Sequence, residues 1–341
     1  MSVARKKAAN DEKINIKKVT ERSEEIVIAL VGYAGAGCSS IAEKLINLLD
    51  SQGYERPIRI KLSDQIVEYY KAETVPKVEA APNKGISTFD RAEKLQNLGD
   101  RLRQEKGELA LSALAIKKIQ EERGESKAGR EKRAFIIDSI KHFEEIVLLR
   151  QVYGKSFYLL AIHCDRKARE KRLFGGKVSD VKFAGVAKKK VIKFLDRDEK
   201  DNENSAGQQV IKAFHHADYF LDNNEPNEES ATADLQRLID LILGSDLVRP
   251  TLRETGMYFA HTAALRSSCL SRQVGASLQS IDGTIVATGA NDVPAVGGGI
   301  CGEDKEPEHR CFLWDKKLED GTVFRGCHNY RMKKELQLKI A

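Results

Sequence analysis

A glycine-rich loop near the N-terminus has residue types and spacing that could bind phosphate. Residues 26–31, IVIALV, form an apolar run typical of a buried parallel strand, and the pattern Gly32-x-x-x-x-Gly37-x-Ser39 follows at once. In a strand, loop and helix setting, backbone N–H groups surround a phosphate while the serine hydroxyl reaches Mg²⁺. The alternative is a glycine turn that only packs a helix on a sheet. The setting favours a nucleotide site, and the residues expected to form it are Gly32, Gly35, Gly37, Cys38, Ser39 and Ser40.

Position 38 departs from this pattern, because the motif carries lysine there and this chain has Cys38. A thiol with an ordinary pKa of about 8.5 brings no positive charge to the β- and γ-phosphates of a nucleotide. Binding tolerates that loss better than phosphoryl transfer, which depends on stabilising charge in the transition state. We therefore expect nucleotide binding with poor phosphoryl transfer.

An aspartate at the end of another apolar run could complete the site. The segment Arg133-Ala-Phe-Ile-Ile-Asp138 reads as a buried strand, and an acid at the end of such a strand is typical of the Walker-B carboxylate that helps to hold Mg²⁺. A helical stretch from about residue 90 to residue 120 precedes it. Most arginines of this stretch fit a solvated face, but Arg91 and Arg103 could contact a nucleotide if the helix lines the pocket. The cofactor that these residues predict is Mg²⁺ bound together with the nucleotide.

The most basic part of the chain lies between residues 166 and 200, where there are 13 Lys and Arg residues and 5 Asp and Glu residues. The simplest interpretation is a solvated charged face. As a cluster that follows the fourth expected strand, the segment is similar to the arginine-bearing lid of small nucleotide kinases. Its candidates for nucleotide contact are Arg166, Arg172 and Arg197.

A sheet must position these candidates. Apolar runs at residues 26–31, 58–62, 133–138, 157–162 and 218–222 alternate with stretches of helical character. This alternation predicts an α/β fold, with a P-loop parallel sheet and helices on both faces. We expect a flexible tail over residues 1–24, a P-loop nucleotide-binding (kinase-like) domain over 25–245 and a second domain over 246–341.

The second domain opens with a different pattern. Apolar residues at helical spacing over 257–265 are followed by two strands, 274–278 and 284–288, joined by Asp282-Gly283, a strong hairpin signal. The runs RSSCLSRQVGA (266–276) and GANDVP (289–294) resemble the opening of a deoxycytidylate deaminase domain. That resemblance implies a partial cytidine-deaminase-like α/β domain. In it, Asn291 would contact the nucleotide sugar, and Arg266 and Arg272 would contact substrate phosphates.

The zinc motifs of such deaminases do not follow in this sequence. A His-x-Glu supplies one ligand and the general acid/base, and a Pro-Cys-x-x-Cys supplies two further ligands. Neither motif occurs after Pro294, and we interpret the His142-Phe-Glu144 of the first domain as a chance match. The resemblance implies zinc, but its ligands are unknown, since the remaining candidates match no standard spacing. These candidates are Cys301, His309, Cys311, Cys327 and His328.

The order of the two domains is similar to that of bacterial anti-phage deoxycytidylate (dCMP/dCTP) deaminases. Over residues 25–300, this resemblance implies a hydrolase acting on deoxycytidine nucleotides and regulated by its P-loop domain, in a chain truncated before the zinc motifs and inactive alone. Two other interpretations remain. One is a nucleoside or nucleotide kinase with an extra module, which Cys38 weakens. The other is a nucleotide-binding regulator without activity of its own, which the missing zinc motifs favour.

Composition and net charge limit the class of protein, its expected location and its expected partners. With 41% hydrophobic and 32% charged residues, and no apolar run near the ~20 residues of a membrane helix, the chain has the composition of a soluble globular protein. The absence of a signal-peptide core and of a cysteine framework predicts a cytoplasmic, reduced location. A net charge of +6 suits phosphate-bearing ligands and does not by itself support nucleic acid. The expected partners are deoxycytidine nucleotides, a nucleoside triphosphate and further copies of the chain in a homo-oligomer.

Overall fold

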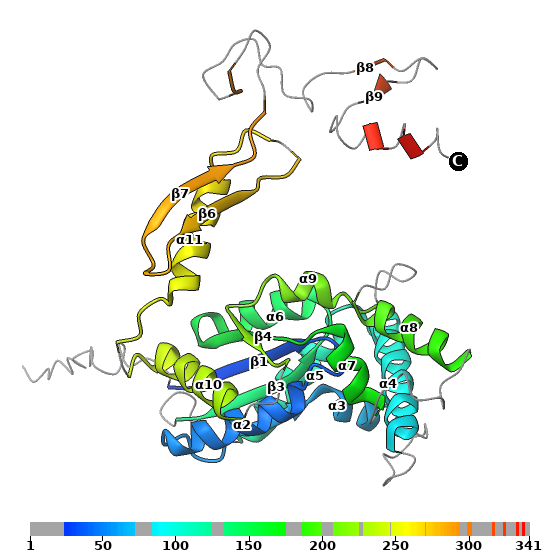
Figure 1. Cartoon of the computed structure of the whole chain (residues 1–341). Helices are drawn as coiled ribbons and strands as arrows, with labels where there is room; N and C mark the ends of the chain where they lie inside the picture. The colour runs from blue at the N-terminus through cyan, green and yellow to red at the C-terminus, as the bar shows by residue number, and fades with distance from the viewer. Residues whose placement is uncertain are drawn as a thin grey trace, which may run out of the picture. The chain divides into compact units, whose positions relative to one another are not determined.

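The computed structural model of the chain describes residues 24–71, 84–124, 132–174, 186–199, 207–224, 228–245, 247–269, 271–293 and 299–301, with short pieces at 316–317, 323–324, 332–333 and 336–337 (Figure 1). The expected tail, residues 1–24, lies outside the described residues except for Glu24. The chain divides into two compact units, Met1–Asp246 and Leu247–Ala341.

The first unit is built on a five-stranded sheet whose strands are all parallel. The strands are β1 (Ile26–Gly32), β2 (Ile58–Lys61), β3 (Ala134–Ile140), β4 (Phe157–His163) and β5 (Tyr219–Asp222), in the spatial order β2-β3-β1-β4-β5. All seven residues of the central strand β1 are buried, which accounts for its continuous apolar run. The predicted α/β fold with a parallel sheet is confirmed.

Alternate residues of β1 point into two separate hydrophobic cores, as the period of a strand requires. Val27, Ala29 and Val31 share one core with α3 (Leu62–Tyr69), α4 (Lys84–Lys106), α5 (Ala110–Arg123), α6 (Phe143–Tyr153) and α9 (Val210–Phe214). Ile26, Ile28 and Leu30 share the other core with α2 (Cys38–Ser51) and α10 (Glu228–Leu243). The 3-10 helix η1 (Gly154–Ser156) joins α6 to β4. Figure 1 shows α2 below the sheet and α6 and α9 above it, so helices cover both faces as predicted.

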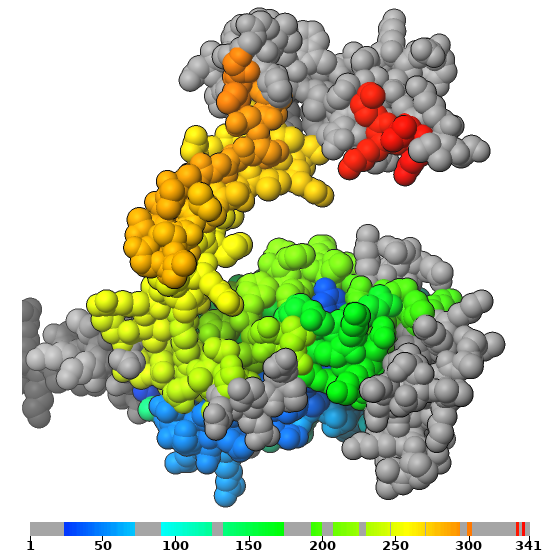
Figure 2. Space-filling model, viewed as in Figure 1, coloured from blue at the N-terminus to red at the C-terminus, as the bar shows by residue number. Residues whose placement is uncertain are grey.

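Two further helices lie near the glycine-rich loop. Helix α7 (Arg166–Phe174) begins just after β4, and α8 (Val186–Glu199) comes from the basic segment. Leu173, Phe194 and Leu195 form a small apolar cluster against Ala34 of the loop and Ala92 of α4. In the space-filling view, blue α2 and green α7 both lie at the surface of the first unit (Figure 2). Apolar contacts of Leu173, Phe194 and Leu195 therefore hold the basic segment beside the loop.

The single helical stretch expected over residues 90–120 is wrong, because two helices occupy it. Helix α4 ends at Lys106, α5 begins at Ala110, and Gly107 between them has a φ of 92°. A Cβ at Gly107 would have no atom within 4 Å, so glycine is favoured there by its backbone conformation alone. The break allows α4 and α5 to contribute to the same core.

The second unit contains a helix packed on a β-hairpin. Helix α11 (Leu252–Ala264) begins with a capping box of Thr251 and Glu254. Strands β6 (Gly275–Gln279) and β7 (Ile285–Ala290) are antiparallel, which confirms the predicted hairpin. A Cβ at Gly275 would lie 1.9 Å from Ala260 O, so only glycine allows this close approach of helix and strand.

Several large apolar side chains of the second unit remain exposed. Met257 is 69% exposed, and Leu278 and Val286 are each 61% exposed. Two short strands, β8 (Lys316–Lys317) and β9 (Val323–Phe324), pair in antiparallel fashion farther along the chain. Among the helices that the structure describes in either unit, none combines the length and apolar character needed to cross a bilayer.

Candidate functional site

The glycine-rich loop connects the carboxyl end of β1 to the N-terminus of α2. Strand β1 lies between β3 and β4, so the loop lies where the strand order changes direction, the usual ligand position in an open α/β sheet. Gly35 and Gly37 have φ values of 83° and 94°, which favour glycine. Ala36 N donates to Tyr33 O at 2.9 Å within the turn. The loop therefore has a backbone conformation that its glycines allow and that this internal hydrogen bond holds.

Side chains from distant parts of the sequence hold this loop in place. Ala36 O accepts hydrogen bonds from Asn223 Nδ2 at 2.7 Å and from Arg172 Nη1 at 3.1 Å. A Cβ at Gly37 would lie 2.5 Å from Asn223 Nδ2, so this contact also requires glycine. These two hydrogen bonds are accepted by a carbonyl of the loop and do not involve its N–H groups.

Cys38 begins α2 and is buried, with 7% of its surface exposed. Burial, reinforced by the charge of Asp138, raises the pKa of the Cys38 thiol to about 12. The side chain is therefore a neutral thiol at ordinary pH and acts as neither a cation nor a thiolate nucleophile. Position 38 contributes packing, and any positive charge near the phosphate position must come from elsewhere.

Ser39 and Asp138 meet at the start of α2. Ser39 Oγ donates to Asp138 Oδ2 at 2.9 Å, and Asp138 is fully buried. The next residue, Ser139, has a φ of 75°, and the pairing of β1 with β3 shifts register at this point. Such an irregularity re-aims a side chain at the end of a strand. Because Mg²⁺ prefers oxygen ligands, the hydroxyl and the carboxylate fit the ion that would accompany a nucleotide.

Arg59 of β2 also binds Asp138. Its Nε and Nη2 atoms lie 3.1 Å and 2.6 Å from Asp138 Oδ2, while Nη1 lies 3.1 Å from Glu43 Oε1. The guanidinium balances a carboxylate that would otherwise be an uncompensated buried charge. The sequence did not indicate a role for Arg59, because a basic residue inside a short strand does not reveal which acid it pairs with.

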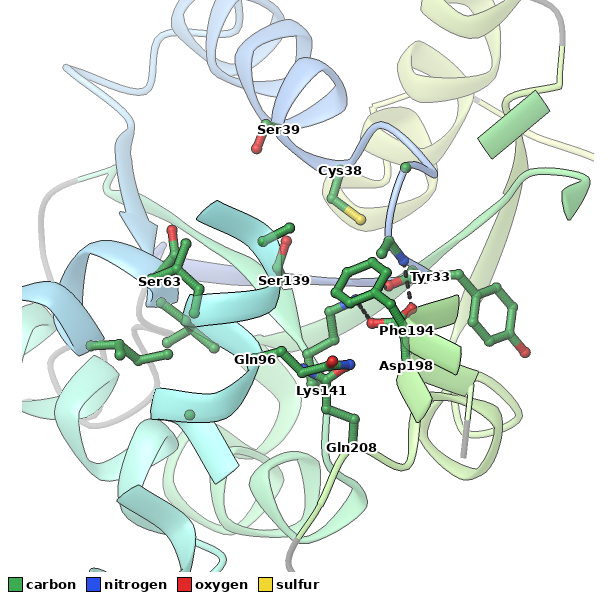
Figure 3. A pocket seen from close by; sticks show the side chains of 18 of the residues that line it. Tyr33, Cys38, Ser39, Ser63, Gln96, Ser139, Lys141, Phe194, Asp198 and Gln208 are labelled. Carbon is green, nitrogen blue, oxygen red and sulfur yellow. Dashed lines mark hydrogen bonds and ion pairs between the residues drawn. The ribbon is translucent and has the colours of Figure 1, made fainter. Parts of the chain in front are cut away.

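Lys141 and Asp198 were also missed by the sequence analysis, and both contact the loop (Figure 3). Lys141 Nζ donates to Gly32 O and to Asp198 Oδ1, each at 2.8 Å. The other oxygen, Asp198 Oδ2, accepts from Ala34 N at 2.6 Å. One carboxylate thus joins a lysine to a backbone N–H of the glycine-rich loop. The only sequence signal was the position of Lys141 three residues after Asp138.

A cavity of about 350 Å³ extends from the loop. Its apolar wall includes Leu62, Ile66, Leu95, Leu111 and Phe194. Its polar side contains the amides of Gln96 and Gln208, which are buried and joined by a hydrogen bond of 3.1 Å from Gln96 Nε2 to Gln208 Oε1 (Figure 3). An apolar pocket with a few placed polar groups is typical of a small-molecule site.

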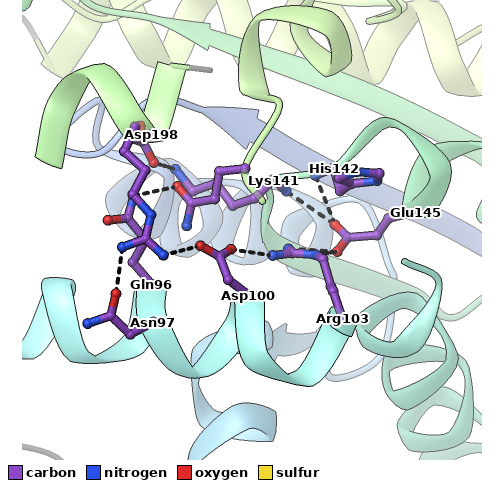
Figure 4. Close-up of polar contacts among 10 residues, drawn as sticks. Gln96, Asn97, Asp100, Arg103, Lys141, His142, Glu145 and Asp198 are labelled. Carbon is purple, nitrogen blue, oxygen red and sulfur yellow. Dashed lines mark hydrogen bonds and ion pairs between the residues drawn. The ribbon is translucent and has the colours of Figure 1, made fainter. Parts of the chain in front are cut away.

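Buried charges support the far wall of the cavity (Figure 4). Arg103 Nε and Nη2 lie 2.9 Å and 2.8 Å from Glu145 Oε1, and Arg103 Nη1 lies 3.3 Å from Asp100 Oδ1. Glu145 also accepts from the backbone N–H groups of Lys141 and His142, each at 3.2 Å. The network therefore ties α4 to the segment that carries Lys141. Arg103 lines the cavity, whereas Arg91 is not one of its described lining residues.

The other predicted basic residues have different surroundings. Arg172 reaches the loop, as described above, and its Nη2 also bonds the carbonyls of Asn223 and Asn224. Arg166 pairs with Asp196 at 2.8 Å. Arg197 bonds Asn97 and Asp100 of α4. The structure thus brings Arg172 to the glycine-rich loop, while Arg166 and Arg197 join helices α7 and α8 to neighbouring acids. Ser40 is exposed.

Arg169, one turn before Arg172, packs closely on the loop. Its guanidinium lies 4.7 Å from the centre of the Tyr33 ring, and its carbonyl would be 2.8 Å from a Cβ at Gly35. Arg169 Nη2 donates to Glu199 at 2.7 Å. Its Nε and Nη1 atoms are buried and have no hydrogen-bond partner among the described residues. Two buried donors without acceptors are a costly arrangement that a bound anion would relieve.

The three candidates of the second unit are placed as follows. Asn291 Nδ2 donates to Arg272 O at 2.8 Å, and its Oδ1 accepts from Val274 N at 2.7 Å. Its side chain thus joins the segment before β6 to the end of β7. Arg266 and Arg272 are exposed. Their predicted roles toward a substrate remain predictions.

No group of three or more His, Cys, Asp or Glu residues that could hold a metal occurs within the described part of the chain. Cys301 is described and buried, whereas His309, Cys311, Cys327 and His328 lie outside the described residues. His142 belongs to the N-terminal cap of α6, with its Nδ1 accepting from Glu144 N at 3.3 Å. That role accounts for the His-x-Glu pattern in the first unit without a metal.

The first unit is an α/β domain with a five-stranded parallel sheet, helices on both faces and a glycine-rich loop between β1 and α2. No protein-family model matches the chain, and no curated protein matches it.

Among solved structures, the chain is similar to shikimate kinase from Acinetobacter baumannii in complex with shikimate, at 14% identity and a TM-score of 0.33, over 68% of this chain and 99% of that chain. It is also similar to APS kinase from Mycobacterium tuberculosis in complex with AMPPNP and APS, at 18% identity and a TM-score of 0.33, over 65% and 98%. A gluconokinase from Sinorhizobium meliloti 1021 matches at 14% identity and a TM-score of 0.28, over 66% and 99%. Similarity at this level says nothing about the substrate or reaction of this chain.

Proposed function

We propose that the first unit binds a nucleoside triphosphate together with Mg²⁺. The observation that carries this proposal is the 2.9 Å hydrogen bond between Ser39 and Asp138, which joins the end of the glycine-rich loop to the end of a neighbouring parallel strand. The loop N–H groups and the N-terminus of α2 would hold phosphate, and the two side-chain oxygens would hold the ion. A turn that only packed a helix on a sheet would need no buried carboxylate at this position.

The charges around the loop support the same proposal. Arg169 presents two buried donors that lack an acceptor among the described residues, and it packs against Tyr33 and Gly35. Phosphate oxygens are strong acceptors for guanidinium groups. Arg172 lies one helical turn farther along α7 and already binds the carbonyl of Ala36. Helix α7 therefore offers two arginines to a ligand bound at the loop.

A second candidate function is phosphoryl transfer to another small molecule. The cavity of about 350 Å³ leads from the loop to a pocket with apolar walls and the amides of Gln96 and Gln208, which leaves room for an acceptor beside the phosphates. The neutral thiol at position 38 argues for slow transfer. We therefore expect tight binding to be easier to detect than turnover.

For the second unit, we propose a relationship to deoxycytidine nucleotide deaminases of the anti-phage type, with the first unit as a nucleotide-binding regulator. Support comes from two sequence runs, 266–276, which joins the observed helix α11 to β6, and 289–294, which begins at the end of β7, in the order expected for the start of such a domain. The described residues supply no zinc site. The proposal for this unit concerns ancestry and nucleotide recognition, and deamination by this chain alone is not part of it.

Calorimetric titration of the full chain with ATP and with dCTP, each with and without Mg²⁺, tests the main proposal. Asp138→Asn should weaken Mg²⁺-dependent binding at least about tenfold, because a charged contact contributes roughly 1.5–3 kcal/mol, and should change binding in EDTA much less. Ser51→Ala is the control, since Ser51 lies at the exposed opposite end of α2, where its hydroxyl donates to Leu48 O. No binding of either triphosphate at millimolar concentration would remove the proposal. A radiolabel assay for phosphoryl transfer to a panel of nucleosides tests the second candidate.

A further inference from the structure

The glycine-rich loop lacks the lysine of its motif, yet a lysine amino group lies against it. Lys141 follows β3 directly, and β3 is the neighbour of β1 in the sheet. Its Nζ donates to Gly32 O, the carbonyl of the first residue of the loop, at 2.8 Å. The side chain is 17% exposed, so this ammonium group is only partly solvated. A strand next to β1 thus delivers the charge that position 38 does not carry.

The counter-ion of Lys141 is Asp198, and its carboxylate makes contacts like those of a bound phosphate. Asp198 comes from α8, and its side chain is 2% exposed. Oδ1 lies 2.8 Å from Lys141 Nζ, while Oδ2 accepts from Ala34 N at 2.6 Å (Figure 3). A phosphate bound at a glycine loop makes the same two kinds of contact, one to a backbone N–H and one to a cation. The carboxylate therefore occupies a position suited to a phosphate oxygen.

We propose that Lys141 replaces the missing lysine of the loop, and that Asp198 holds its place until a terminal phosphate displaces the carboxylate. This inference rests on the proposed nucleotide binding. A phosphate group with two negative charges would bind Lys141 more strongly than the single charge of Asp198 does, at the same distance. Displacement of Asp198 would break the contact of α8 with Ala34 N, so occupancy of the site would be coupled to how α8 is held.

The other interpretation is a structural ion pair that fastens α8 to the sheet. It predicts that removing Lys141 lowers stability without changing how the chain distinguishes nucleotides by their phosphates. The proposal predicts a specific loss for triphosphates, since only a terminal phosphate reaches the Lys141 position. Binding of ATP relative to AMP therefore separates the two interpretations, and a loss of stability alone does not.

The test is titration of the full chain with ATP and with AMP in the presence of Mg²⁺, using four variants. Lys141→Met should weaken ATP binding at least about tenfold, the size of one charged hydrogen bond, and leave AMP binding within about twofold of wild type. Asp198→Asn should tighten ATP binding, because the competing charge is gone. The double variant K141M/D198N removes both members of the pair, so a folded protein is available even if K141M leaves Asp198 too costly to bury.

The fourth variant is a rescue. Cys38→Lys in the Lys141→Met background returns a lysine to the position that the motif normally uses, and it should restore most of the lost ATP affinity. ATP binding by K141M equal to that of wild type, or equal losses for ATP and AMP, would overturn the inference while leaving the proposed function intact. Failure of the wild-type chain to bind ATP would overturn both. Circular dichroism of each variant confirms that it is folded.

Discussion

Replacing Arg103 with methionine should destabilise the first unit by about 3–5 kcal/mol, because the change leaves a buried carboxylate without its counter-ion. Arg103 places two donors, Nε and Nη2, at 2.9 Å and 2.8 Å from Glu145 Oε1, and the two side chains are 1% and 0% exposed. In the variant, the bonds that Glu145 would keep among the described residues are those from the N–H groups of Lys141 and His142, at 3.2 Å. Methionine fills similar volume, so the loss would report the charge rather than a cavity.

Urea unfolding of the full chain, followed by far-ultraviolet circular dichroism, measures this change. The double variant R103M/E145Q should recover about 2 kcal/mol, because the glutamine oxygen still accepts from the backbone while the buried charge is gone. Lys117→Met is the control. Its side chain is 72% exposed and pairs with Glu121 at 3.8 Å, so its loss should stay below about 1 kcal/mol. An R103M loss as small as that of the control, or no recovery in the double variant, would refute the reasoning.

Two further predictions concern Cys38 and the second unit. Because the folded state keeps the Cys38 proton up to a pKa of about 12, the unfolded state releases it first, and wild type should lose stability relative to Cys38→Ala as the pH rises above the ordinary thiol value of 9.0. The slope should approach 1.4 kcal/mol per pH unit, roughly the value for one proton, in urea titrations across that range, and parallel pH profiles would contradict it. The purified chain should contain no stoichiometric zinc and should not convert dCMP or dCTP to uracil nucleotides, because a zinc hydroxide needs three protein ligands and a carboxylate. Metal analysis and a product assay check this, and stoichiometric zinc with turnover would point to Cys301 and the histidines and cysteines that follow it.

The sheet of the first unit could be predicted because its strands are short and are apolar either throughout, as in β1, or at alternate positions, as in β2. Strand β1 is buried on both faces, so every residue in it is apolar or small, and a short run of this kind indicates a buried strand. The glycine loop that follows has a fixed spacing with a physical reason for each glycine. Asp138 was predictable for the same reason, because it follows an apolar run, although the predicted end of the strand at Asp138 is wrong, since β3 continues to Ile140. These features are local, and local features can be read along a sequence.

The missing parts are contacts between distant residues. Lys141 and Asp198 are 57 positions apart, and Ala34 and Asp198 are 164 apart, so nothing in their neighbourhoods links them. In the basic segment, the sequence indicated arginines, whereas the residue that contacts the loop amide there is an acid. The break at Gly107 was missed for another reason. A single glycine within a helical pattern is tolerated often enough that its positive φ becomes evident only in the structure.

The two buried acids nearest the loop are each paired with a basic side chain, Asp138 with Arg59 and Asp198 with Lys141. Each of these two buried carboxylates therefore has a counter-ion within the site. A triphosphate with Mg²⁺ brings both signs of charge, so Asp138 would contact the ion and Lys141 would contact a phosphate, while Asp198 would be displaced from Lys141. A phosphate without the ion would release Asp198 but leave Asp138 with Arg59. On the proposed function, this difference makes the magnesium complex, rather than free nucleotide, the ligand that both pairs favour.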